Sequence, residues 1–161
     1  MAIQASIKSN SKIILKKFKH LESKLPRIID KGLKQAGFQL LDIIRTKTQK
    51  GQDFRGRPFA PYSQGYLKQL TKEGKPTRVD LFNTGRMLGS LTPSSTVKPS
   101  GKNKVSLAFS NAQMRQRALF NQVLGKNKRE FFGFNSRTEK IISKQFNRFV
   151  EKEIRGMKLW A

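Results

Sequence analysis

Apolar side chains recur at helical spacing over most of the first 50 residues. After an alternating stretch at residues 2–8, typical of a short half-buried strand, intervals of four, three and four separate Ile14, Phe18, Leu21 and Leu25. Pro26 breaks or kinks this helix, or begins the next one. Apolar positions continue at the same spacing from Ile29 to Ile44, and the helix they indicate is expected to run to about residue 49. The pattern therefore predicts long N-terminal helices.

Two glycines lie inside the second predicted helix, at Gly32 and Gly37. Glycine weakens a helix interior by about 1 kcal/mol relative to alanine. We therefore expect another element to pack closely against the helix at these positions.

The chain changes character after Gly51. Residues 51–63 combine glycines and prolines, which interrupt regular structure, with Phe and Tyr rings that favour burial. This composition predicts an ordered loop pinned by its rings. A short helix is expected around residues 66–70, and the polar residues 71–78 are the best candidate for a mobile segment.

The remaining predicted elements are short until the C-terminus. In chain order they are a capped helix at 84–91, a hairpin of 94–99 and 104–110, a helix capped by Asn111 and ended by Gly125, a strand or buried turn at 130–134, and a final helix opened by a capping box of Ser136 and Glu139. These elements predict an α+β fold with a small antiparallel sheet and a C-terminal helix. We expect an N-terminal strand and helix extension over residues 1–25 and a single domain over residues 26–161.

Composition adds a strong positive charge to this picture. The 161 residues include 34 Lys and Arg but only 10 Asp and Glu, for a formal charge of +24. Residues 1–50, 51–110 and 111–161 contribute +9, +7 and +8, so the folded body itself is cationic. Such a body repels its own copies unless nucleic acid, an acidic protein surface or anionic lipid neutralises it.

Two helical ridges are candidate contacts to an anionic partner. One consists of Lys12, Lys16 and Lys19, and the other of Arg137, Lys140, Lys144 and Arg148. Each ridge could neutralise several phosphates, and the alternative is a solvated helix face. Phe54, Phe59 and Tyr62 could stack on bases, but their Pro and Gly context favours anchoring of the loop.

Little in the sequence points to catalysis. The chain has no Cys and one His, His20, among lysines, so thiol chemistry and a His-based metal site are not expected. No phosphate-binding glycine motif is present, and neither a cofactor nor a metal is predicted. A pair of carboxylates acting as acid and base is left open, with Asp53 and Asp80 as residues to test. We also expect no signal peptide, because the first residues show no basic region followed by an apolar block. No membrane partner is expected, because no apolar run approaches the length of a membrane span.

Several of these segments together resemble a family of tailed-phage virion morphogenesis, neck and tail completion proteins (Mu G protein-like). The resemblance rests on the loop with Asp53, Phe54, Arg57, Phe59 and Tyr62, on the block with Thr84, Gly85, Arg86, Leu88 and Ser90, and on the segment 129–134 before the final helix. The block at residues 84–90 is its most specific part. The chain departs from the pattern at Phe54 and Asn121, where many relatives have Trp and His, and residues 1–25 have no counterpart.

The resemblance implies a structural virion protein that joins head to tail or terminates the tail tube. Such proteins form rings, commonly of six or twelve subunits. The implied partners are further copies and the connector, head-closure and tail-tube proteins, with DNA in the channel as a further candidate. The implied location is the virion, after assembly in the host cytoplasm. The loop residues named above would then form an assembly loop. The alternatives are a stand-alone basic nucleic-acid-binding module and a small hydrolytic enzyme.

Overall fold

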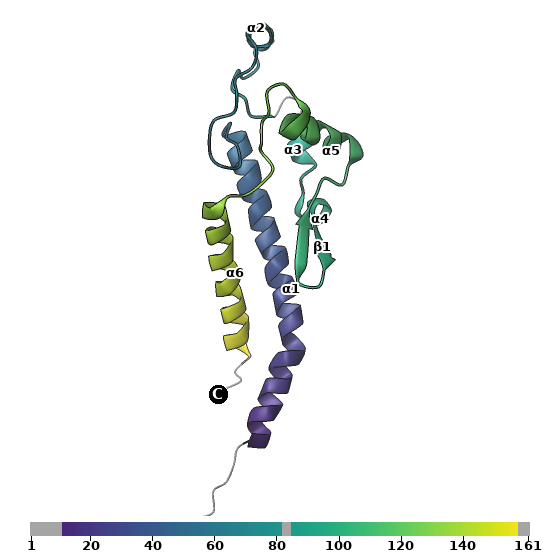
Figure 1. Ribbon diagram of the computed structural model, residues 1–161, viewed down its shortest axis with the longest axis vertical. Coiled ribbons are helices and arrows are strands. Elements are labelled where there is room, and N and C mark those ends of the chain that lie inside the picture. Colours follow the sequence, from purple (N-terminus) through teal and green to yellow (C-terminus); the bar gives the residue numbers. More distant parts are fainter. Residues whose placement is uncertain (1–10, 82–84, 158–161) are drawn as a thin grey trace, which may run out of the picture.

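One long helix forms the axis of the protein. In the computed structural model, which describes residues 11–81 and 85–157, α1 (Ser11–Gln49) contains 39 residues. The C-terminal helix α6 (Ser136–Gly156) lies antiparallel beside it, and a hairpin of β1 (Val97–Gly101) and β2 (Lys104–Leu107) packs on another side (Figure 1). The α+β class, the hairpin and the C-terminal helix are thus confirmed.

Shorter helices gather near the C-terminal end of α1 (Figure 1). They are α2 (Gln64–Lys72), α3 (Arg86–Gly89), α4 (Pro93–Thr96), α5 (Ala112–Leu119) and the π-helical turn η1 (Phe120–Leu124). The short helix expected around residues 66–70 is therefore confirmed as α2.

The predicted break at Pro26 is wrong, because α1 continues through that residue. Proline removes one backbone hydrogen bond from a helix interior. Pro26 and Glu22, four residues earlier, are both exposed, so water can solvate the carbonyl that this leaves without a helical donor. The expected boundary between residues 25 and 26 falls inside α1, and the strand expected at residues 2–8 lies outside the described residues.

Close packing at the two helix glycines is confirmed. A Cβ placed on Gly32 would lie 2.8 Å from the Phe146 ring, and Phe149 is also in contact there, so α6 approaches the α1 backbone closely. On Gly37 it would lie 2.6 Å from Val97 of β1. The two glycines therefore let α6 and the hairpin pack directly against the α1 backbone.

The core lies around the C-terminal half of α1. Leu41 and Ile44 of α1 meet Leu88, Leu91 and Phe131, and all five are 2% exposed or less. Phe109 and Phe132 extend this cluster through ring contacts with Phe131. By contrast, no residue from 11 to 27 is buried, so the first part of α1 projects beyond the core.

Strand and cap predictions are partly corrected. Residues 93–96 form α4 rather than strand, because Thr92 accepts a hydrogen bond from Ser95 N–H and Pro93 occupies the first turn. Residues 130–134 contain no strand, and Phe131 is buried in an irregular segment instead.

Helix caps lie close to where the sequence places them. Asn111 caps α5, as expected, and Gly125 ends the following η1. The cap of α6 is Asn135, whose side chain accepts from Thr138 N–H at 2.9 Å, and not Ser136. Asn and Ser are both good N-cap residues. The spacing of Ser136 and Glu139 therefore could not distinguish them and placed the start of α6 one residue late.

Replacing Gly37 by Ala tests the close packing of the hairpin on α1. The new methyl group would press on Val97, whose branched side chain has little room to turn. We expect the free energy of unfolding to fall by about 1–3 kcal/mol, more than the helix gains from losing a glycine. Urea titration measures this. Gly65→Ala in α2, where nothing lies within 4 Å, is the matched control and should be neutral or slightly stabilising. Equal behaviour of the two variants would contradict the packing described here.

Candidate functional site

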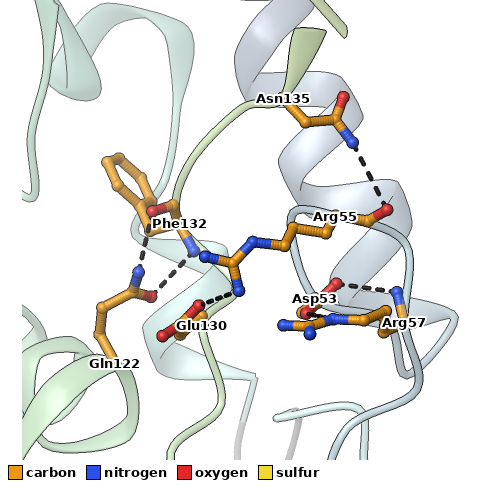
Figure 2. A network of polar contacts seen from close by, with 7 residues as sticks. All are labelled: Asp53, Arg55, Arg57, Gln122, Glu130, Phe132 and Asn135. Carbon is orange, nitrogen blue, oxygen red and sulfur yellow. Dashed lines mark hydrogen bonds and ion pairs between the residues drawn. The ribbon is translucent and has the colours of Figure 1, made fainter. Parts of the chain in front are cut away.

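The loop after α1 is held closed by a buried carboxylate. Gly51 ends the helix with a φ of 76°, and Asp53, 6% exposed, begins a tight turn. Asp53 accepts hydrogen bonds from the backbone N–H of Arg57 at 2.8 Å and from its Nε at 2.9 Å (Figure 2). The Asp53 N–H also donates to the Arg57 carbonyl at 2.8 Å. Asp53 and Arg57 therefore define the shape of the loop.

These contacts also affect the acidity of Asp53. Burial by itself would raise the pKa of this carboxyl, but the hydrogen bonds and positive charge of Arg57 outweigh burial and hold the pKa below its ordinary value of 3.8. Asp53 is thus an ionised structural group bound to Arg57. A general acid would require the opposite shift.

The loop is clamped to the segment that precedes α6. Phe54 N–H donates to the Glu130 carbonyl at 2.9 Å, and the Arg55 guanidinium pairs with the Glu130 carboxylate at 2.9 Å. The Asn135 side-chain amide reaches the Arg55 carbonyl at 3.4 Å (Figure 2). From α1, the Lys47 ammonium donates to the Phe54 carbonyl at 2.9 Å.

A side-chain amide fixes the other side of this segment. The Gln122 amide donates to the Phe132 carbonyl and accepts from the Phe132 N–H, both at 3.0 Å (Figure 2). Residues from α1, the loop, η1 and the start of α6 thus form one connected network.

Aromatic rings of the loop are engaged within this chain. Phe59 is buried in the core, and the Phe54 ring packs on Gly133, 3.1 Å from the position a Cβ would take there. Tyr62 meets Tyr66 edge-on, with centroids 4.9 Å apart, and the Arg129 guanidinium lies 5.0 Å from the Tyr62 ring centroid. These contacts favour the anchoring interpretation over a platform for stacked bases.

Beside the loop lies a cleft of about 620 Å³ that the sequence did not suggest. Most of its polar groups are amides and guanidiniums, and Tyr62 adds a phenol whose pKa is raised by burial and by the negative charge of Asp80. The lining residues are Tyr62, Leu81, Gly85, Met87, Gln113, Gln116, Arg117, Phe120, Asn121 and Arg129. They come from segments far apart in sequence, so no local pattern could have brought them together.

Within the block at residues 84–90, the described residues contribute to packing and to the backbone turn before α3. Gly85 takes a φ of 68° just before α3, Leu88 is 1% exposed, and the Ser90 hydroxyl donates to the Met87 carbonyl at 2.7 Å. Arg86 is exposed. Thr84 lies outside the described residues.

The structure keeps the two basic ridges apart. Lys12, Lys16 and Lys19 are exposed on the projecting start of α1, whereas Arg137, Lys140, Lys144 and Arg148 are exposed along α6, beside the later part of α1 (Figure 1). Among the described residues, none of the seven pairs with a carboxylate. Glu139 and Glu151 adjoin the α6 ridge.

Groups suited to chemistry are sparse in the described part of the chain. No cluster of three or more His, Asp or Glu side chains that could hold a metal occurs within residues 11–81 and 85–157. His20 is exposed on α1. None of the described helices is long and apolar enough to cross a bilayer.

Comparisons with known proteins add no relative. No family model matches the chain, no curated protein matches it, and no solved structure resembles it significantly. The contacts and charges described above are therefore the basis of any functional proposal.

Replacing Asp53 by Asn tests the loop closure. The variant loses the charged acceptor for Arg57, and we expect about 1–2 kcal/mol lower stability at neutral pH. Because the folded pKa lies below that of the unfolded chain, this stabilisation is complete above about pH 5 and is lost progressively as pH falls through the unfolded and then the folded pKa. Thermal unfolding from neutral to acidic pH should therefore show the two proteins converge. Glu73→Gln, which removes an exposed ion pair with Lys75, is the control and should differ little from wild type at either pH. A constant gap down to low pH would contradict this role.

Proposed function

We propose that this protein is a structural component of a tailed-phage virion, forming a ring that joins head to tail or terminates the tail tube. The observation that carries the proposal is the projecting start of α1. Ile13, Ile14 and Leu15 are 58%, 41% and 59% exposed there, on a stretch in which nothing is buried. Several exposed apolar side chains gathered on one short stretch of helix mark a candidate site of association.

A second apolar surface lies at the far end of the molecule. Leu119, Phe120, Val123 and Leu124, on α5 and η1, are each 48% exposed or more. Two separate apolar surfaces on one chain suit a subunit with neighbours on more than one side. A ring subunit has this arrangement.

The charge supports association with anionic partners. Even if each of the 10 carboxylates paired with a different basic residue, 24 of the 34 Lys and Arg would have no carboxylate in the chain. DNA in a channel, or acidic rings above and below, would supply the missing counter-charge. The connector, head-closure and tail-tube proteins are the proposed neighbours, in a ring of six or twelve copies.

The rigid loop fits the same proposal. Asp53, Arg57 and the clamp to Glu130 hold the loop in one shape, and a subunit that must fit its neighbours needs preformed surfaces. Together with the block containing Gly85, Leu88 and Ser90, the loop carries the resemblance to neck and tail completion proteins. The proposed function involves no bond-breaking step, and its proposed place is the virion after assembly in the host cytoplasm.

The basic ridge on α6 favours one alternative, a stand-alone nucleic-acid-binding module. Arg137, Lys140, Lys144 and Arg148 follow one another on the exposed side of a single helix, so a phosphate backbone could lie along it. The two functions differ in oligomeric state, since a stand-alone binder needs no closed assembly.

Oligomeric state and DNA binding, measured together, separate these functions. For the purified full chain, we expect closed rings of uniform subunit number by electron microscopy and mass photometry, with or without short duplex DNA. A protein that stays monomeric from roughly 0.1 to 1 M salt, yet binds DNA with a steep salt dependence, would be the stand-alone module.

Charge removal on α6 then shows what the ridge contacts. Changing Arg137, Lys140, Lys144 and Arg148 to Gln should reduce the salt slope of DNA binding by about 0.9 for each lost phosphate contact. The control changes Lys68, Lys72, Lys126 and Lys128, four exposed lysines elsewhere, to Gln and removes the same charge. Equal loss in both variants would mean that total charge matters and the ridge does not.

A further inference from the structure

A shallow apolar groove runs along α1 beside the hairpin, and its smaller part lies between the hairpin and α6. It consists of two adjoining hollows of about 300 and 440 Å³ that share Val105. Mostly aliphatic α1 residues form the floor of both hollows. The hairpin forms a wall of both, whereas α6 lines only the smaller one. The apolar lining residues are Leu25, Pro26, Ile29, Leu33, Ala36, Gly37, Leu40, Pro99, Val105, Leu107, Phe134 and Ile142.

The groove carries an unusual share of the acidic residues. Glu22, Asp30 and Glu139 line it, and none of them forms an ion pair within the described part of the chain. Lys34, Lys102 and Lys104 also line it, so acidic and basic groups balance there. Over the whole chain, basic residues exceed acidic ones by 34 to 10. The groove is thus a place where an apolar, basic segment could bind with little repulsion.

The start of α1 is a segment of that kind. Ile13, Ile14 and Leu15 present exposed apolar side chains, and Lys12, Lys16 and Lys19 surround them with positive charge. The two surfaces cannot meet within one molecule. Leu15 and Ala36 belong to the same continuous helix, 21 residues apart, which corresponds to about 31 Å along its axis.

We propose that the start of α1, residues 12–19, of one copy docks in the groove of the next copy. The inference rests on the proposed ring and names the contact that would build it. Ile14 and Leu15 would cover Ala36 and Leu40, while the lysines would face Asp30 and Glu139, the two groove carboxylates close to that position. Because the contact joins two different surfaces, it leaves one of each free at the ends of any open chain, and a ring satisfies them all.

Single cysteines test this contact, because the natural chain contains none. Leu15→Cys and Ala36→Cys are purified separately, mixed and oxidised. We expect disulfide-linked dimers in the mixture and none in either protein alone, because each link joins a helix start to a groove. Lys68→Cys on α2 replaces Ala36→Cys as the control and should stay at background. Dimers of Leu15→Cys alone would indicate a symmetric contact and overturn the proposal, as would a mixture no better than the control.

A protein carrying both cysteines extends the test. It should give a ladder of cross-linked species whose largest member has the subunit number of the ring seen by electron microscopy. Rings that form without the 15–36 link would overturn this contact and leave the ring proposal intact. A protein that stays monomeric and gives no link would overturn both.

A charge exchange checks the electrostatic part. Lys12→Glu with Lys16→Glu in the Leu15→Cys protein should lower the link yield several-fold, and so should Asp30→Lys with Glu139→Lys in the Ala36→Cys protein. Mixing the two altered proteins should restore most of the yield, since opposite charges again face each other. Failure of this rescue, with both proteins folded by circular dichroism, would overturn the assigned charge pairing.

Discussion

The close approach of two elements to the backbone of α1 determines the architecture. At Gly32 the rings of Phe146 and Phe149 reach the helix, and at Gly37 Val97 of the hairpin does so. A side chain larger than hydrogen at either position would push its partner outward. The rest of the core, centred on Leu41, Leu88 and Phe131, is assembled around the segment of α1 next to these two glycines. Gly37 and Ala36 also lie in the floor of the groove, where the hairpin and α6 line its two sides.

The same packing leaves the first part of α1 uncovered. A helix of 39 residues is about 58 Å long, and the other elements within the described residues cover only part of it. Stability therefore comes from the covered part, whereas the projecting part is available for association. The polar network around Asp53 and Glu130 serves the opposite end, where it fixes an irregular loop that has little regular backbone hydrogen bonding of its own.

The excess of positive charge acts on the whole molecule. It opposes contact between copies, so any assembly needs either local balance, as in the groove with Glu22, Asp30 and Glu139, or neutralisation by an anionic partner. Neighbouring copies can therefore bind only where the burial of apolar side chains outweighs the repulsion between positive charges. This combination suits ordered assembly better than general aggregation.

Local sequence determined much of the secondary structure, because helix periodicity, caps and turns depend on neighbouring residues. This made it possible to predict the helical spacing of α1, the C-terminal helix, the Asn111 cap and the hairpin. The close packing at Gly32 and Gly37 could be predicted in the same way. The absence of a break at Pro26, the helical residues 94–96 and the choice between strand and buried turn at 130–134 could not be judged locally. Exposure to water lets the helix tolerate proline, and Phe131 is buried in the core without regular strand pairing. Only tertiary structure decided which distant segments meet: the clamp between Arg55 and Glu130, the cleft beside Tyr62, the separation of the two basic ridges and the groove along α1. These features join residues far apart in the chain, and such contacts depend on packing and not on spacing along the sequence.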